Sequence, residues 1–221
     1  IAQIEDRGAR REHRGLLSGV VDHPALDDVT GLHAVMEMAR ELASGCADDV
    51  AKARSVYLFV RDRIAHSVDA GRDDLPCRAS EVLAAGTGIG FSKSHLLAAL
   101  LRAVGVPSGF CYQVLRRSPD GAETLLYGFN GVYLPSRERW ILLDARGNRP
   151  GLSAEFSIEE PRLAVMADPA RGEWIYPLIW TRPAAVIVDL LSRNKSLSRI
   201  AEHVPAELPG VAREASAPSA R

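Results

Sequence analysis

The first part of the chain places its apolar residues at the spacing of amphipathic helices. One pattern, with apolar residues three and four positions apart, covers residues 32–42, and a second covers residues 50–64. Asp48 and Asp49 stand directly before the second pattern, where a carboxylate can accept a hydrogen bond from a first-turn N–H group. We therefore predict two helices, each with one apolar face.

Two further helices are expected before the period changes. Ser80 can cap a short helix that stops at Gly86, because glycine readily takes the left-handed conformation that ends helices. A longer apolar helix is expected from about Gly90 to Ala103, and Pro107 prevents it from continuing much further.

The middle of the chain changes to short runs of aromatic and β-branched residues. These runs cover residues 108–117, 124–134 and 139–145, and turn-like segments separate them. The pattern predicts three antiparallel strands in a meander.

Helical patterns return near the end of the chain. A short helix is expected over residues 159–168, and two closing helices over residues 183–193 and 196–204. Helices, then a sheet, then helices predict an α+β domain, with N-terminal helices packed on an antiparallel sheet and closing C-terminal helices.

Composition marks both ends of the chain. The stretch 5–14 is dense in charge and has no apolar period, so we expect a flexible charged arm over residues 1–16. From position 207 the chain is rich in proline, alanine and serine, and we expect a disordered tail over residues 207–221. Between them we predict a single domain, residues 17–206.

The overall composition is that of an ordinary globular protein, with 221 residues, 47% hydrophobic and 25% charged, and a formal net charge of -1. This balance lacks the positive excess that non-specific nucleic-acid binding requires, so no nucleic-acid partner is expected. The longest apolar runs fall far short of the roughly 20 residues that span a bilayer, so no membrane role is expected. Without a visible secretory signal, cytoplasmic residence is the default expectation. The oligomeric state stays open.

The cysteines and histidines show no ligand pattern. Cys46, Cys77 and Cys111 are an odd number without CxxC spacing, which disfavours a disulfide framework and a thiolate zinc site. The histidines are scattered, and none pairs at i,i+4 beside a glutamate. We expect reduced and mostly buried thiols, no metal and no cofactor.

One stretch carries most of the functional information. Residues 79–115, ASEVLAAGTGIGFSKSHLLAALLRAVGVPSGFCYQVL, resemble the core motif of the transglutaminase-like superfamily of papain-type cysteine enzymes, especially the bacterial transglutaminase-like cysteine peptidases. The segments YGFNGVYLP, RWILLDARGNRPGL and EWIYPLIWTRP follow in the order of that branch, so the resemblance extends from about Arg54 to about His203. It implies a papain/transglutaminase-like core.

The resemblance also implies where the chemistry lies. In that family a cysteine opens the helix, a histidine follows in the sheet, and an aspartate on the next strand orients the imidazole. Alignment on KSHLLAALLR places Gly90 at the cysteine position, and alignment on GFNGVYL places Tyr127 at the histidine position. At the aspartate position of the family, Asp144 in ILLDARGN retains the acidic side chain. The match therefore implies that thiol acyl transfer is lost.

No neighbouring residue is a good substitute for the thiol. Ser92 lies two positions along the helix, about 200° around its axis from Gly90, and so points away from any pocket that Gly90 lines. Cys111 falls on a strand and is expected in the core. Lys93 and His95 resemble family residues that accompany the nucleophile, and we expect scaffold hydrogen bonds from both.

The substitutions suggest another use of the same place. Without a side chain at Gly90, space opens above the N–H groups of the helix start, which attract a carboxylate, an enolate or a carbonyl oxygen. Tyr127 and Asp144 would pair a proton donor or hydrogen-bond clamp with a base, and we predict these two as catalytic residues. Small-molecule contacts are expected from Gly90 and from six further residues: Phe91, Tyr112, Gln113, Phe129, Trp140 and Arg146.

Two functions remain open. One is a repurposed enzyme that promotes cyclisation, isomerisation or elimination of a mostly apolar small molecule, with specialised metabolism as the context. The other is a pseudoenzyme that binds a ligand or docks a partner, for which we expect a blocked cleft with Tyr127 packed over Gly90. A laboratory inactivation is disfavoured, because two positions differ and carry glycine and tyrosine rather than alanine or serine.

Overall fold

The structure is a computed structural model that describes residues 29–118, 121–200 and 203–212. Helices and an antiparallel sheet share one chain, so the α+β prediction is confirmed. The helices predicted over residues 32–42 and 50–64 and from Gly90 to Ala103 are also confirmed. The α-helices in the described residues have these bounds: α2 (Val29–Ala43), α3 (Asp49–Arg63), α4 (Ala79–Ala85), α5 (Gly90–Ala103) and α6 (Ala185–Arg193).

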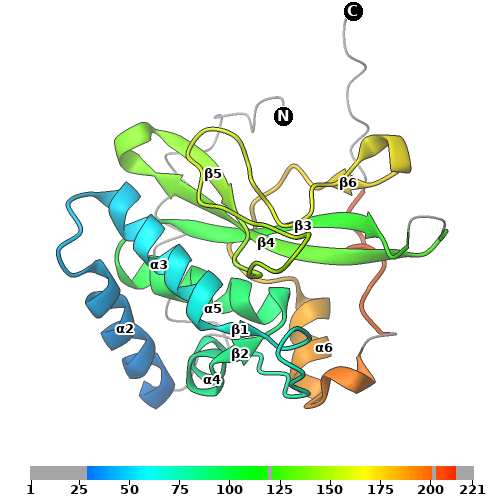
Figure 1. The fold of residues 1–221 in the computed structure, drawn as a ribbon, viewed down its shortest axis with the longest axis horizontal. Helices are drawn as coiled ribbons and strands as arrows, with labels where there is room; N and C mark the ends of the chain where they lie inside the picture. Colours follow the sequence, from blue (N-terminus) through cyan, green and yellow to red (C-terminus); the bar gives the residue numbers. More distant parts are fainter. Residues whose placement is uncertain (1–28, 119–120, 201–202, 213–221) are drawn as a thin grey trace, which may run out of the picture.

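The main sheet has its strands in the order β5-β4-β3-β6 (Figure 1). β3 (Ser108–Arg116), β4 (Thr124–Leu134) and β5 (Arg139–Leu143) are consecutive and antiparallel, which confirms the predicted meander. β6 (Trp174–Ile175) pairs with the other edge of β3.

A second, two-stranded sheet leads into the central helix. β1 (Ala65–His66) runs parallel to β2 (Thr87–Gly88), and α5 begins two residues after β2 ends. The sequence did not predict β1, β2 or β6, because two residues are too few to show a period.

The two faces of the main sheet are covered differently. The helices lie on one face, and the segment between β5 and β6, drawn in yellow tones, runs over the other (Figure 1). On the helix face the ring of Phe91 packs over Gly128, where an added Cβ would stand only 2.6 Å from a ring carbon. Gly128 therefore allows α5 to approach β4 closely. On the other face Leu163 packs against Cys111 and Phe129.

α5 is the central helix of the core. Its four leucines, which are all fully buried, pack with apolar residues of α2, α3 and β4: Leu96, Leu97, Leu100 and Leu101. Burial of each leucine contributes about 1.5–3 kcal/mol, so this packing fixes where the N-terminus of α5 meets the sheet.

α4 ends as predicted but begins differently. Gly86 closes it in the left-handed conformation, with φ of 64°. Ser80 is not its cap: Arg78 is the N-cap, and the Glu81 carboxylate accepts hydrogen bonds from the N–H groups of Cys77 and Arg78. A carboxylate near the helix start accepts these bonds more strongly than a neutral hydroxyl.

The helix predicted over residues 159–168 is wrong. This segment forms bends and extended backbone instead. Its backbone groups bind elsewhere: the N–H of Ala164 donates to Asp144, and the carbonyl of Arg162 accepts from the N–H of Glu155. These bonds replace those that a helix would make.

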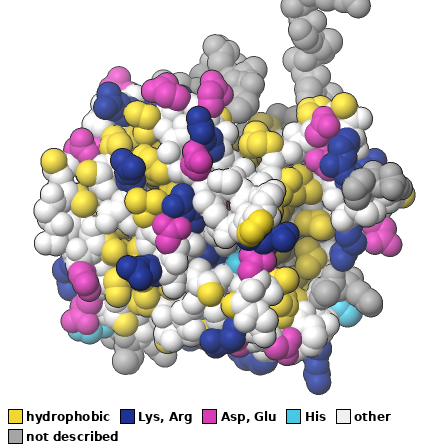
Figure 2. All heavy atoms as spheres, in the orientation of Figure 1, with side chains coloured by type: hydrophobic (Ala, Val, Ile, Leu, Met, Phe, Trp, Pro, Cys, Tyr) yellow, Lys and Arg dark blue, Asp and Glu magenta, His cyan; other side chains and the backbone are white. Residues whose placement is uncertain are grey.

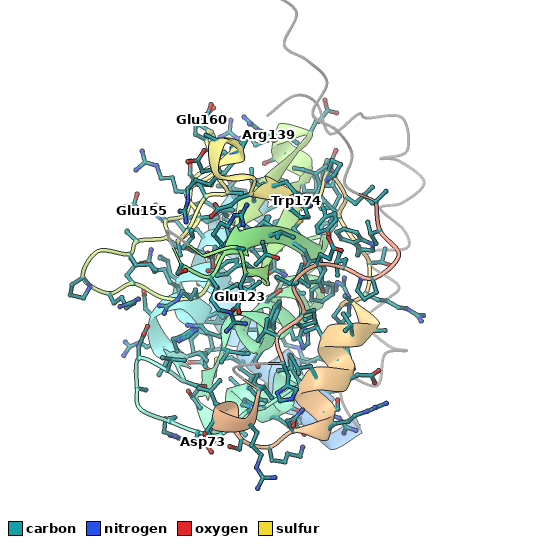
Figure 3. The ribbon with its side chains drawn as sticks, turned by 90° about the vertical axis from the view of Figure 1, so that its right-hand side faces the viewer. Asp73, Glu123, Arg139, Glu155, Glu160 and Trp174 are labelled. Carbon is teal, nitrogen blue, oxygen red and sulfur yellow. The ribbon has the colours of Figure 1, made fainter. Side chains whose placement is uncertain are left out.

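The helix predicted over residues 196–204 is also wrong in its described part, which forms only the short 3-10 helix η3 (Leu197–Arg199). Asp73 explains the difference. Its carboxylate accepts hydrogen bonds from Ser196 Oγ (2.5 Å) and from the N–H of Ser198 (2.8 Å). Figure 3 shows Asp73 beside this segment. These bonds to a residue distant in sequence occupy groups near the start of the expected helix and fix the backbone in another conformation.

The chain remains packed beyond position 207. Leu208 is buried, and its N–H donates to Tyr176 Oη at 3.1 Å. Leu208 thus joins the core cluster that contains α6, within the region where a disordered tail was expected. The disorder of the tail stays a prediction. Positions 213–221 and the predicted arm over residues 1–16 lie outside the described residues.

Candidate functional site

Asp144 directly follows β5 and is only 1% exposed. Its carboxylate accepts three hydrogen bonds: from Tyr127 Oη (2.8 Å), the N–H of Arg146 (3.0 Å) and the N–H of Ala164 (2.9 Å). Burial raises the pKa of Asp144, and these three donors oppose that rise. Its backbone carbonyl accepts a bond from Tyr57 Oη at 3.1 Å, so α3 also fixes the position of Asp144.

Tyr127 lies in β4, directly opposite Gln113 of β3. Opposed residues point to the same face of a sheet, and the next residue, Gly128, is the one that contacts Phe91 on the helix face. Burial and the charge of Asp144 raise the pKa of Tyr127 well above its ordinary value. The phenol therefore stays protonated and donates to Asp144, while its oxygen can still accept a hydrogen bond.

Residues 163–168, called the strap below, cover the sheet face that carries Gln113. The Gln113 side chain donates from Nε2 to the carbonyl of Val165 (2.7 Å) and accepts at Oε1 from the N–H of Ala167 (3.2 Å). Asp144 holds the strap as well, through Ala164. Gln113, a predicted substrate contact, thus uses both polar atoms on the strap.

α5 begins at Gly90 without a side chain that caps its first turn. The N-cap is Ile89, and an aliphatic side chain cannot accept bonds from first-turn N–H groups. An added Cβ at Gly90 would meet only the carbonyl oxygen of Gly128, at 3.9 Å, which is ordinary contact. The helix start thus has room for additional atoms at Gly90, beside the strand that carries Tyr127.

Lys93 serves the scaffold, as predicted. It is fully buried, and its Nζ donates to the carbonyls of Ile64 (2.5 Å), Arg146 (2.9 Å) and Arg61 (3.3 Å). Burial lowers the pKa of Lys93 to about 7, and the charge of Asp144 opposes that change. The ammonium group ties the C-terminal end of α3 to the loop after β5.

Arg146 connects two acids. Its guanidinium donates to both carboxylate oxygens of Asp69, at 2.6 and 3.1 Å, while its backbone N–H donates to Asp144. This bidentate contact lowers the pKa of Asp69. Arg149 Nε lies 3.6 Å from the same carboxylate. The guanidinium of Arg146, a predicted substrate contact, is therefore bound within the protein.

A partly buried histidine that the sequence analysis did not select lies beside this region. His66 in β1 pairs with Gly88, two residues before Gly90, and its side chain is 11% exposed. Its Nδ1 is buried without a hydrogen-bond partner among the described residues, and Asp69 Oδ2 lies 3.9 Å away. Burial, with the charge of Arg146, lowers the pKa of His66 to about 4. A single histidine in a two-residue strand gives no sequence signal.

The other candidate nucleophiles are held elsewhere. Ser92 Oγ donates to the carbonyl of Pro76 at 2.6 Å, in line with its predicted direction away from the site. Cys77 Sγ lies 3.5 Å from Ser192 Oγ in α6, and burial raises the pKa of Cys77. Cys111 is buried in the core, as predicted, and burial raises its pKa as well.

The predicted aromatic contacts lie in different places. Tyr112 faces the helix side of the sheet, where its hydroxyl accepts a backbone N–H just before α6. Phe129 packs on the opposite face. Trp140 packs against Tyr133 with tilted rings whose centroids are 5.4 Å apart, and Tyr133 lies six residues, roughly 20 Å of strand, from Tyr127. The structure brings together Tyr127 and Asp144, and Phe129 lies in the same cluster as Tyr127. Phe91 packs on Gly128 from the helix face, and Tyr112 and Trp140 lie apart from the pair.

The described part of the chain gives few further signals of a partner. Acidic and basic side chains are intermixed on the face drawn in Figure 2. Within residues 29–118, 121–200 and 203–212, no group of three or more His, Cys, Asp or Glu side chains is placed to hold a metal ion. In those same segments, no helix has both the length and the apolar character needed to cross a bilayer. The absence of a metal or cofactor stays a prediction.

One comparison with known proteins identifies a family. A family model described as the transglutaminase-like superfamily matches residues 36–145. A search of curated proteins found no match.

Three solved structures are similar at low identity. A candidate cysteine protease from Cytophaga hutchinsonii is 15% identical over 52% of this chain and 37% of its own, with a TM-score of 0.42. A candidate protease from Parabacteroides distasonis is 12% identical over 62% of this chain and 30% of its own, and a TGase is 14% identical over 70% and 42%, both with TM-scores of 0.40. This chain thus spans less than half the length of each.

Proposed function

We propose that this chain, which belongs to the transglutaminase-like superfamily, has lost cysteine catalysis and uses the same place for acid–base chemistry on a mostly apolar small molecule. The substrate carries a carbonyl or carboxylate group, and the reaction is a cyclisation, an isomerisation or an elimination, with specialised metabolism as its context. The observation that carries the proposal is the 2.8 Å hydrogen bond between Tyr127 Oη and Asp144 Oδ2. Tyr127 and Asp144 are the catalytic residues in this proposal, and Gly90 and Phe91 contact the substrate.

The cysteines support the loss of thiol chemistry. A nucleophilic cysteine needs a lowered pKa, beside an imidazole, another cation or a helix N-terminus. Burial has the opposite effect on the pKa of Cys77 and of Cys111. Cys46 donates its thiol to the carbonyl of Leu42 at 3.5 Å, next to the end of α2.

The hydrogen-bonded pair offers a path for one proton. A ligand X–H group at Tyr127 can give its proton to Oη while the phenol proton moves to Asp144 Oδ2. The electron pair stays on the ligand as an enolate or alkoxide, and Asp144 becomes protonated. The raised pKa of Asp144 favours this transfer. First-turn N–H groups of α5 can stabilise the negative charge, and the reverse transfer returns the proton to another ligand atom.

A second candidate function has its own supporting observation. All three donors to Asp144 come from the protein, and one of them belongs to the strap. The carboxylate is therefore satisfied without a ligand, as expected of a pair that only stabilises the fold. A pseudoenzyme of this kind binds a ligand or docks a partner without chemistry.

The two functions differ in proton exchange with a simple apolar ketone. For the enzyme, we expect full-length protein to accelerate the exchange of the α-protons of 2-octanone in D2O, followed by NMR. Tyr127→Phe and Asp144→Asn should each reduce the rate at least 10-fold, because each breaks the proton path. Acceleration that survives both substitutions rejects the pair as the catalyst. No acceleration over buffer favours the pseudoenzyme.

Restoring the lost residues tests where the site lies. Because a side chain at Gly90 has room, we expect Gly90→Cys with Tyr127→His to create a thiol that an imidazolium activates. Its alkylation by iodoacetamide at pH 6, measured by peptide mass mapping, should be about 10-fold faster than in the matched Gly90→Cys, Tyr127→Phe variant. Equal rates would show that positions 90 and 127 do not face one another and would reject the alignment.

A further inference from the structure

We infer that His66, oriented by Asp69, is a second proton-accepting residue of the candidate site, on the β1 side of the α5 N-terminus. This inference rests on the proposed function, because it supplies a proton acceptor at a second position. The reactions proposed above move a proton between two places on a ligand, and the Tyr127–Asp144 pair accounts for only one of them.

The backbone places His66 close to the start of α5. His66 is opposite Gly88 in the parallel β1–β2 pair, and the N–H of Ser67 donates to the carbonyl of Gly88 at 3.2 Å. Lys93 in the first turns of α5 bonds to the carbonyl of Ile64, two residues before His66. The backbone of His66 is thus held beside the helix start by both neighbouring segments.

The surroundings of the ring select one tautomer. Asp69 Oδ2 lies 3.9 Å from Nδ1, and no described residue forms a hydrogen bond with that buried nitrogen. A carboxylate at this position favours the proton on Nδ1, which leaves the lone pair on Nε2. Catalytic hydrogen bonds are often long in the absence of a ligand and shorten in the complex. A buried nitrogen without a partner is otherwise rare.

The charges around the imidazole keep it neutral. Burial and the charges of Arg146, Lys93 and Arg149 disfavour the imidazolium, and the charge of Asp69 favours it. Asp69 is itself bound by Arg146 in a bidentate contact. The imidazole is therefore unprotonated at neutral pH and has a lone pair available for a proton, although its lowered pKa makes it a weaker base than an ordinary histidine.

The proton step balances without a further reactant. Of the two α-carbons of a ketone, one gives its proton to the Tyr127–Asp144 pair and the other gives its proton to His66 Nε2. In the second case the C–H electron pair forms the carbon–carbon double bond of the enolate. The carbonyl π pair moves to oxygen, where α5 N–H groups can stabilise it. Asp69 stabilises the imidazolium through Nδ1–H until the proton returns to the ligand.

Long-range 1H–15N NMR of full-length protein tests the inference without a substrate. We expect His66 to be neutral at pH 6.5, with its proton on Nδ1, and Asp69→Asn to weaken that preference. His33, whose side chain is 68% exposed, provides an internal reference signal. A proton on Nε2, or a charged His66 at pH 6.5, would overturn the inference.

The ketone assay separates this inference from the proposed function. If both hold, His66→Gln should slow exchange at one of the two α-carbons of 2-octanone at least 10-fold, while 2-octanone still shifts the amide signals of Gly90 and Phe91. Exchange that depends on Tyr127 but not on His66 rejects His66 and keeps the proposed function. Without exchange in the unmodified protein, the proposed function fails, and the tautomer measurement still decides the state of His66.

Discussion

Two buried polar regions meet at Arg146 and differ in how completely their groups are paired. On one side the Lys93 ammonium donates to three carbonyls, and Asp144 accepts three hydrogen bonds. On the other side Nδ1 of His66 has no hydrogen-bond partner in the described residues, and Asp69 lies beyond bonding distance.

The difference separates groups whose hydrogen bonds stabilise the fold from a group that makes no hydrogen bond to stabilise it. A buried polar atom that finds all its partners stabilises its surroundings, whereas one that lacks a partner costs free energy. Lys93 connects α3, α5 and the loop after β5. His66 makes no such connection through its ring, so its burial needs another explanation.

Among the predictions, Lys93→Met is expected to cause the largest loss in the free energy of unfolding. The substitution keeps much of the side-chain volume but leaves three carbonyls without their donor, so we expect the free energy of unfolding to fall by about 3–5 kcal/mol. Urea denaturation at pH 7 measures it. Lys195→Met, at an exposed position, should change the value by less than about 0.5 kcal/mol. If the two variants lose equally little, the paired region does not hold the fold and the comparison fails.

The next effect concerns His66 and pH. The unfolded chain takes up a proton near the ordinary histidine pKa of 6.5, whereas burial keeps His66 neutral down to about pH 4. The unfolded state therefore binds more protons between these values, and stability falls as pH falls through this window. The loss from this group amounts to roughly 3 kcal/mol.

His66→Gln should remove this part of the acid sensitivity. Denaturation of both proteins at pH 4, 5 and 6.5 measures the difference, which should be largest between pH 6.5 and 4. If the free energy of unfolding changed with pH in the same way for both proteins, His66 would be charged or freely solvated in the folded state. The contrast with Lys93 would then disappear.

The sequence predicted the fold where residues repeat with a period. The helical spacing before residue 104 and the three strand runs after Pro107 match α2, α3, α5 and the meander, and Asp48 caps α3 by accepting the N–H of Ala51. The expected helices at 159–168 and 196–204 failed because Asp144 and Asp73, distant in sequence, bind their N–H groups. Local propensity contains no information about those partners.

The candidate site also has some features that the sequence predicted and others that it did not. Family resemblance indicated Tyr127 and Asp144, and the two side chains are hydrogen-bonded. It gave no indication that Gln113 would hold the strap, because Val165 and Ala167 are 52 and 54 residues away. His66 was missed because β1 and β2 meet only through long-range pairing. Contacts between distant segments, rather than residue types, determine these roles.

The smallest expected loss in the free energy of unfolding concerns two tyrosine hydroxyl groups, which both donate a hydrogen bond to Asp144. Tyr127 donates to its carboxylate at 2.8 Å, and Tyr57 donates to its backbone carbonyl at 3.1 Å. A bond to a charged acceptor is stronger than one to a neutral carbonyl, so Tyr127→Phe should cost about 2 kcal/mol and Tyr57→Phe about 1 kcal/mol. Urea denaturation at pH 7 and 4 measures both.

The comparison also reports the charge on Asp144. Because burial raises the pKa of Asp144, a fall in pH protonates it in the folded protein before it is protonated in the unfolded chain. Tyr127→Phe should lower the free energy of unfolding more than Tyr57→Phe does at pH 7. This difference between the two variants should shrink toward pH 4, since the charged acceptor is removed. Equal losses at pH 7 would mean that Asp144 is already neutral there. The pair would then give a proton to a ligand instead of accepting one, and the proposed direction of transfer would have to be reversed.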